Sequence, residues 1–167
     1  MSFINCINKK YPRLKVAKYA TKWDTPTAVN DAKTAMSTYS DLKGIYAQWS
    51  GPVPGILSAE KASGKYTKVG AAKHIVIVSN DGVPFEMANI RSGIQDATIS
   101  QPANLYAQYA IFYAKQAKAG VTYHVGQSTD HGSKIVNLSG NLEDAIVAPL
   151  VTKANVNDKN LWGNRKH

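Results

Sequence analysis

Apolar residues recur at helical spacing in the stretch that follows Thr25. Thr25 and Pro26 have the chemistry of a helix N-cap and first helical residue. The spacing predicts a long amphipathic helix over residues 25–50, whose apolar face packs on the protein's own core or on a partner helix. The residues of that face are Val29, Ala32, Met36, Tyr39, Leu42, Tyr46 and Trp49.

The pattern changes after this helix. Residues 50–70 are rich in glycine, proline and serine, which predicts an irregular connector. The run KHIVIVS, Lys73 to Ser79, is apolar and β-branched on both faces. We therefore expect a central strand there, covered on both sides. A short helix is expected over Phe85–Ile94.

The last third of the chain predicts a helix, two strands and a final helix. SQPANLYAQYAIFYAKQAKAG has Pro102 near its start and ends at Gly120, as helices often do. Strands are expected at Val121–Val125 and Lys134–Leu138. Asn141, Glu143 and Asp144 are typical of the start of a helix that Pro149 would end.

These elements predict a mixed α/β fold. We expect a basic N-terminal arm over residues 1–24 and a single α/β domain over residues 25–167. The domain consists of the long helix, the connector, a small β-α-α-β-β-α layer in residues 71–153 and a tail over residues 154–167.

Positive charge is concentrated in the first half of the chain. Residues 1–73 carry twelve Lys and Arg against four Asp and Glu, whereas residues 74–167 carry eight against seven. Basic residues with aromatic residues among them suit a nucleic acid, an acidic protein surface or a solvated arm. The expected contact residues in the arm are Lys9, Lys10, Arg13, Lys15, Lys18 and Lys22, with Tyr11, Tyr19 and Trp23 as aromatic anchors.

Cysteine content and hydropathy limit the kinds of site and the cellular location that the sequence allows. Cys6 is the only cysteine, so the chain has no internal disulfide and no cysteine-based metal site. The start lacks an apolar run of signal-peptide length, and no segment approaches the roughly 18 apolar residues of a membrane span. We therefore expect an intracellular protein, or one in a virion assembled inside the cell, with no membrane contact.

The segment VTYHVGQSTDHGSK, Val121 to Lys134, contains two histidines. His124 and His131 have no third ligand at close range for a metal, and a Ser128–His131–Asp130 arrangement puts adjacent residues in one turn. Asp and Gly favour turns. We interpret this segment as a polar connection between strands, with no metal and no cofactor, and no catalytic residue is assigned.

Three segments resemble the framework of the type 2 peptidyl-tRNA hydrolases. They are KHIVIVSND, AGVTYHV and GSKIVNLSG…EDAIVAPLVTK, which together span about half of the chain. The resemblance implies a small α/β protein that hydrolyses the ester of a tRNA. No catalytic residue is carried over, because the segments GVPFEMANIRSG and GQSTDHG differ from the family's signatures.

The missing catalytic motifs favour a non-enzymatic protein. Our first hypothesis is an assembly or binding protein, such as a structural component of a phage virion, with other protein chains or copies of itself as partners. The alternatives are a nucleic-acid-binding module that uses the basic N-terminal half, and a small hydrolase of the kind resembled above.

Overall fold

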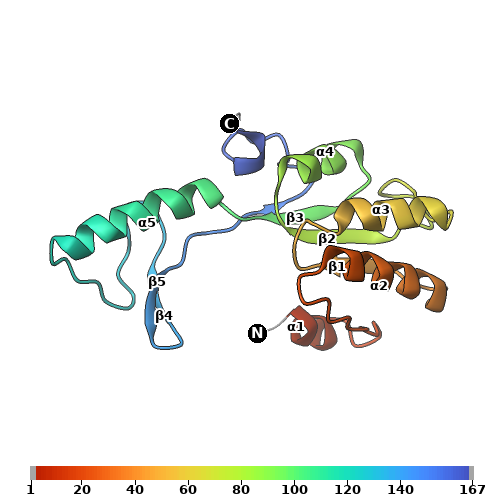
Figure 1. The fold of residues 1–167 in the computed structure, drawn as a ribbon, viewed down its shortest axis with the longest axis horizontal. Helices are drawn as coiled ribbons and strands as arrows, with labels where there is room; N and C mark the ends of the chain where they lie inside the picture. The colour runs from red at the N-terminus through yellow and green to blue at the C-terminus, as the bar shows by residue number, and fades with distance from the viewer. Residues whose placement is uncertain (1–2, 166–167) are drawn as a thin grey trace.

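The computed structural model describes residues 3–165 and has a mixed α/β fold with a mostly parallel sheet. A four-stranded sheet and its helices form the main body, and one helix and a hairpin extend from it (Figure 1). The helices are α1 (Phe3–Lys10), α2 (Thr25–Thr38), α3 (Val53–Ala62), α4 (Pro84–Ser92), α5 (Ala103–Lys118) and the short 3₁₀ helix η1 (Trp162–Asn164). The strands are β1 (Gly44–Ala47), β2 (Val76–Asp81), β3 (Ala97–Ser100), β4 (Ile135–Leu138), β5 (Asn141–Asp144) and β6 (Leu150–Val151).

The main sheet has the strand order β1-β2-β3-β6. Strands β1, β2 and β3 are parallel to one another, and β6 pairs antiparallel with β3. Strand β2 thus lies between two neighbours, and its residues Ile77 and Ser79 are fully buried. The predicted central strand is confirmed, although it begins at Val76 and continues to Asp81. The expected cover on both sides is wrong, because Val76 on the other face is 43% exposed.

The long helix predicted over residues 25–50 is wrong beyond Thr38. Helix α2 begins next to Asp24, whose carboxylate accepts a hydrogen bond from the Thr27 backbone N–H at 2.8 Å and so acts as the N-cap in place of Thr25. Residues 44–47 form strand β1 and pair with β2. Their apolar spacing fits a helix, but pairing with the central strand decides the conformation.

The connector predicted over residues 50–70 contains a helix. Pro52 precedes α3, and Val53 and Ile56 are buried in the core that α3 forms with α2, β1 and β2. Prolines at a helix start are compatible with the helix because the first N–H groups have no partner within it. A second core lies under α4, where Met87 and Ile90 pack with Val151.

Helix α5 and the antiparallel hairpin β4–β5 form a unit that extends away from the main sheet (Figure 1). The predicted helix over this region is confirmed as α5. Two predictions are wrong: residues 121–125 form no strand, and residues 141–144 form a strand in place of the final helix. Gly140 has a φ of 91° and closes the turn that brings β5 back beside β4.

In the predicted arm, residues 1–24, helix α1 is followed by a segment without helix or strand. Residues 1–2 of the arm and residues 166–167 of the predicted tail lie outside the described part of the chain. Phe3 stacks on Tyr46 of β1 with ring centroids 4.4 Å apart. No helix within residues 3–165 is long and apolar enough to cross a membrane.

A buried acidic group lies at the end of the sheet where β2 and β3 begin. Glu60 is 1% exposed, and its Oε1 has no hydrogen-bond partner within the described residues. The ring of nearby His74 is bonded through Nε2 to Asp96 at 2.9 Å. Burial raises the pKa of Glu60 to about 7, with His74 lowering it and Asp96 raising it as smaller effects.

Glu60 should make stability depend on pH. A carboxyl whose pKa is raised on folding contributes stability that is present below its ordinary pKa and is lost as pH rises through the folded value. We expect Glu60→Gln to gain roughly 2 kcal/mol of unfolding free energy over the wild type as pH rises from about 5 to about 8. Urea denaturation at each pH measures this. An equal gain in the exposed control Glu143→Gln would contradict the assignment.

Candidate functional site

The carboxyl ends of β1, β2 and β3 meet at one edge of the main sheet. In open α/β sheets with parallel strands, ligands bind outside this edge. The residues there are Gln48, Trp49 and Ser50 after β1, Asn80 and Asp81 at the end of β2, and Gln101 after β3. In Figure 1 it is the side of the sheet from which the chain leads into α5.

Asp81 is fixed at the centre of this edge. Its Oδ2 accepts hydrogen bonds from the backbone N–H and the hydroxyl of Ser50, each at 2.9 Å. Its other oxygen, Oδ1, accepts no hydrogen bond within residues 3–165. Asp81 is half-buried and has a φ of 108°, a conformation that non-glycine residues rarely adopt. Ser50 thus holds the carboxylate in place through Oδ2, and Oδ1 remains free for a ligand.

The backbone of Asp81 also joins distant parts of the chain. Its carbonyl accepts from the Gln101 N–H at 2.9 Å and from Trp162 Nε1 at 2.7 Å. The next residue, Gly82, has a φ of 72°, and a Cβ there would lie 2.6 Å from Ser100 Cα. Glycine is therefore required for β2 and β3 to approach each other at the site.

Gln101 has a fixed side-chain orientation. Its Oε1 accepts a hydrogen bond from the hydroxyl of Tyr106, in the first turn of α5, at 2.6 Å. The amide NH₂ group has no partner among the described residues. Gln101 therefore offers two donors at the same edge of the sheet as Asp81.

Two tryptophans lie at the end of β1. Trp23 packs against Trp49 in a tilted arrangement, with ring centroids 5.2 Å apart and an interplanar angle of 57°, and is 69% exposed. Trp23 and its neighbour Lys22 both have positive φ, at 63° and 49°. Trp23 thus provides an exposed aromatic surface against Trp49, the residue before the Ser50 that bonds Asp81.

A buried network supports the turn that carries Asp81. Glu86 is fully buried and accepts hydrogen bonds from Gly82 N at 2.9 Å, from Val83 N at 3.1 Å and from the side chains of Ser79 and Gln95. Burial raises the pKa of Glu86, while these four donors act in the opposite direction. Glu86 thereby links β2, α4 and the segment before β3.

The contact residues predicted in the arm are dispersed. Lys9 and Lys10 end α1, and the others lie in the exposed segment that follows it. Only Trp23 among them makes a described contact with a residue of the carboxyl edge. The remaining residues stay predicted partner-binding residues; they are Lys9, Lys10, Tyr11, Arg13, Lys15, Lys18, Tyr19 and Lys22.

The segment with two histidines lies in the extended unit, away from the carboxyl edge. His124 is exposed, whereas His131 is bonded to Asp130 and to Asp144. In the part of the chain that the structure describes, no group of three His, Cys, Asp or Glu is placed to hold a metal ion.

Sequence reasoning missed Asp81 and Gln101. A signal was present, because Asn80–Asp81–Gly82 directly follows the predicted central strand and Gln101–Pro102 precedes the predicted helix. Strand β3 was not predicted, so the position of Gln101 at the same sheet edge could not be inferred.

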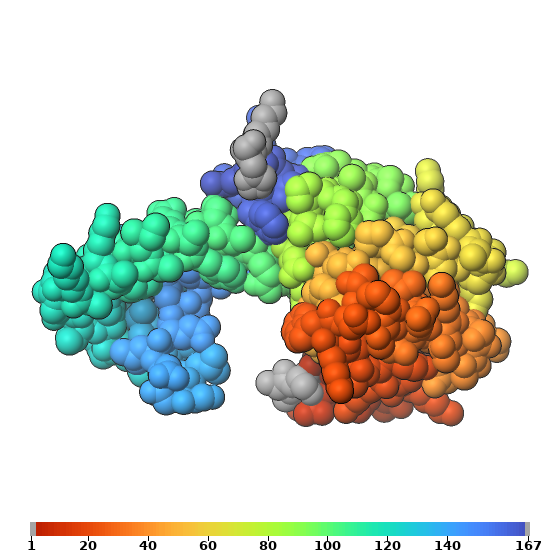
Figure 2. Space-filling model, viewed as in Figure 1, coloured from red at the N-terminus to blue at the C-terminus, as the bar shows by residue number. Residues whose placement is uncertain are grey.

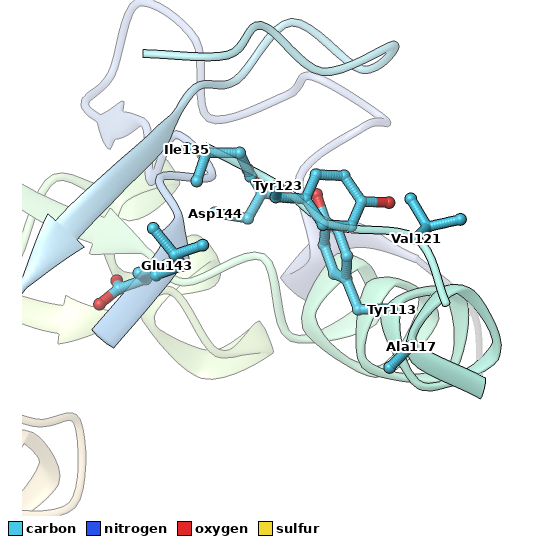
Figure 3. Close-up of a pocket in the computed structure, with 8 residues that line it drawn as sticks. Tyr113, Ala117, Val121, Tyr123, Ile135, Glu143 and Asp144 are labelled. Carbon is cyan, nitrogen blue, oxygen red and sulfur yellow. The ribbon is translucent and has the colours of Figure 1, made fainter. Parts of the chain in front are cut away.

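The space beyond the carboxyl edge is open. Figure 2 shows a hollow between the body formed by α1 to α4 and the β4–β5 hairpin. A separate cavity of about 300 Å³ lies between α5 and this hairpin, lined by residues such as Tyr113, Tyr123 and Ile135 (Figure 3).

Comparison with known proteins gives a family and a fold. The sequence model of the periplasmic binding protein domain matches residues 2–121. The fold is similar to that of a sugar-binding protein of a sugar ABC transporter from Bacillus halodurans, with 18% identity and a TM-score of 0.66 over 93% of this chain and 50% of the other. The arabinose-binding protein AraP from Geobacillus stearothermophilus has 20% identity and a TM-score of 0.65, with 92% and 48% covered. An ABC transporter solute-binding protein from Agrobacterium vitis, bound with α-D-tagatopyranose, has 16% identity and a TM-score of 0.69, with 95% and 46% covered.

These matches overturn the hypotheses drawn from composition. An assembly or virion protein, a nucleic-acid-binding module and a small hydrolase are all contradicted, because the matched family and folds are those of solute-binding proteins. The expected partners, other copies of the chain or nucleic acid, are wrong for the same reason. The intracellular location is also contradicted, since the family takes its description from the periplasm.

Proposed function

Because the chain belongs to the family of periplasmic binding protein domains, we propose that it binds a monosaccharide at the carboxyl edge of its main sheet. The observation that carries this proposal is the free Oδ1 of Asp81 at the end of β2, where Ser50 holds the carboxylate and the Asp81 carbonyl accepts a hydrogen bond from the Gln101 backbone N–H. The solved proteins of similar fold support the sugar as ligand, since their names include arabinose, D-fucose and tagatopyranose.

The polar groups of the edge match the chemistry of a sugar. Each sugar hydroxyl can donate one hydrogen bond and accept others. Asp81 supplies an ionised acceptor, for which hydrogen bonds are stronger than between neutral groups. Gln101 supplies donors whose direction is set by Tyr106. The exposed ring of Trp23, packed against the half-buried Trp49, suits the C–H face of a pyranose, which is apolar.

The chain supplies one part of a larger site. It spans about half the length of the solved proteins that it matches. No residue of α5 is buried, and Ile111 is 61% exposed. A single helix with a two-stranded hairpin has too little core to be stable without a further surface. We infer that a second lobe covers this unit and closes over the carboxyl edge, in the hollow that Figure 2 shows.

Calorimetric titration with single sugars tests the proposal. Arabinose, fucose, tagatose and galactose are suitable probes, and sucrose serves as a control that is too large for a monosaccharide site. We expect heat of binding with at least one monosaccharide and none with sucrose. An absence of binding for all four monosaccharides, with a folded protein, would count against the sugar site.

The tryptophan pair should contribute measurably to binding. We expect Trp23→Ala to weaken the affinity for the bound sugar about fivefold, corresponding to roughly 1 kcal/mol from a lost aromatic contact. Because Trp23 is 69% exposed, its removal should leave the melting temperature nearly unchanged. Tyr11→Ala removes a 56% exposed aromatic from the same segment and is the matched control. Equal affinities for the two variants would argue against the aromatic contact.

A further inference from the structure

A charged network joins helix α5 to the β4–β5 hairpin. Asp144 in β5 has a side chain that is 7% exposed and accepts hydrogen bonds from three groups. The donors are His131 Nε2 at 2.6 Å, the Tyr113 hydroxyl of α5 at 2.9 Å and the hydroxyl of Ser133. Figure 3 shows Tyr113 and Asp144 on facing elements of the unit.

The two ring nitrogens of His131 each contact a carboxylate. Nε2 lies 2.6 Å from Asp144, and Nδ1 lies 2.7 Å from Asp130. An ionised carboxylate only accepts hydrogen bonds, so both nitrogens must carry a proton. The arrangement therefore requires the positively charged imidazolium.

The ring is also held from the side of α5. Tyr109 stacks on His131 with ring centroids 3.6 Å apart and interplanar angle 22°. A cation over an aromatic face is favourable, and the ring side chain of His131 is only 12% exposed. The titratable groups that face His131 are thus Asp130 from its own turn, Asp144 from β5, and Tyr109 from α5.

We propose that His131 is a proton-operated latch, which as the imidazolium fixes the β4–β5 hairpin to α5 and on losing its proton releases it. Loss of a ring proton removes the positive charge between Asp130 and Asp144 and breaks one of the two carboxylate bonds of His131. The Tyr113–Asp144 bond then remains as the hydrogen bond between α5 and the hairpin. An isolated two-stranded hairpin is marginal in water. The released unit also loses the cavity of about 300 Å³, since Tyr113, Ile135 and Asp144 line it from both sides.

The sign of the pH dependence follows from the two partners. Burial lowers the pKa of His131, but its bonds to Asp130 and Asp144 outweigh this and raise it. Burial raises the pKa of Asp144, but the three donors outweigh this and lower it. His131 therefore contributes stability that is fully present below its ordinary pKa and is lost as the pH rises through its raised pKa. Asp144 contributes stability that is present above its ordinary pKa and is lost as the pH falls through its lowered pKa. The latch is closed in mildly acidic solution and opens on the alkaline side.

Amide hydrogen exchange of the whole chain tests the latch. Protection factors, which correct for the intrinsic effect of pH on exchange, are compared at about pH 6 and about pH 9. We expect the protection of β4 and β5 to fall by about tenfold or more at the higher pH, the scale of one charged hydrogen bond. The protection factors of β1, β2 and β3 should be about the same at both pH values.

Substitutions separate the latch from general effects of pH. His131→Gln should show low protection of β4 and β5 at both pH values, and His124→Gln, an exposed residue of the same segment, should behave as the wild type. If His131→Gln unfolds as a whole, the NMR titration of the wild-type His131 ring protons decides, with the pKa of His131 expected above the ordinary value of a histidine. Unchanged protection of the wild-type hairpin between the two pH values, or titration of His131 below the ordinary pKa of a histidine, would overturn the proposal.

Discussion

Replacing Asp81 with asparagine should weaken monosaccharide binding about 100-fold, corresponding to roughly 3 kcal/mol. The free Oδ1 is the acceptor that we assign to a sugar hydroxyl, and an amide forms a weaker hydrogen bond than a carboxylate. Asparagine is the suitable replacement because, with aspartate, it is the non-glycine side chain that best tolerates positive φ, and Asp81 has a φ of 108°. Calorimetric titration with the bound sugar measures the change.

The matched control is Asp41→Asn, which removes the same charge from an exposed position before β1. It should bind the sugar as the wild type does, because it changes the net charge but not the site. A comparable loss of affinity in both variants would mean that overall charge, and not the geometry of Asp81, controls binding. The circular dichroism spectra of the two variants should match that of the wild type.

The largest loss of stability should come from Glu86→Ala. Five donors from β2, the turn after it, Gln95 and β3 converge on this carboxylate, and the side chain is fully buried. Truncation leaves the buried Gly82 N–H and the Val83 N–H without a partner and creates a cavity. We expect the free energy of unfolding to fall by roughly 3–5 kcal/mol. Urea denaturation followed by circular dichroism gives this value.

Glu86→Gln separates hydrogen bonding from charge. Glutamine keeps the volume and one acceptor oxygen, so its cost should be well below that of alanine. Because the Glu86 network holds the turn of Asp81, Glu86→Gln should also weaken sugar binding less than Asp81→Asn does. A glutamine variant as unstable as the alanine variant would point to the carboxylate charge as the main contribution.

The elements that could be predicted are those with local signals. Strand β2 has a β-branched run, and α5 has a clear period that ends at Gly120. Strands β1 and β3, four residues each, have no such signal and exist because they pair with β2. The sequence 141–144 illustrates the same effect: its polar residues suit a helix start, but the Gly140 turn pairs them with β4.

The site was hidden for a related reason. Asp81 and Gln101 are twenty residues apart, and only the parallel pairing of β2 and β3 places them at one edge. Composition drew attention to the basic arm, where charged residues are exposed. The groups that we propose for binding are few and neutral or acidic, so the distribution of basic residues along the sequence could not indicate them. Trp23 was predicted as a contact residue through its basic neighbours, whereas its contact with Trp49 depends on the fold.

The central claim is that the carboxyl edge of the main sheet binds a monosaccharide, and backbone NMR of the isotope-labelled chain tests it most directly. Arabinose, fucose, tagatose and galactose are added singly up to about 50 mM, at which a site with a Kd of about 10 mM is mostly occupied. We predict that at least one sugar shifts the amide signals of Ser50, Asp81 and Gln101 in a saturable way and leaves those of β4 and β5 unchanged. Shifts confined to other parts of the chain, or none with any of the four sugars, would contradict the proposed site.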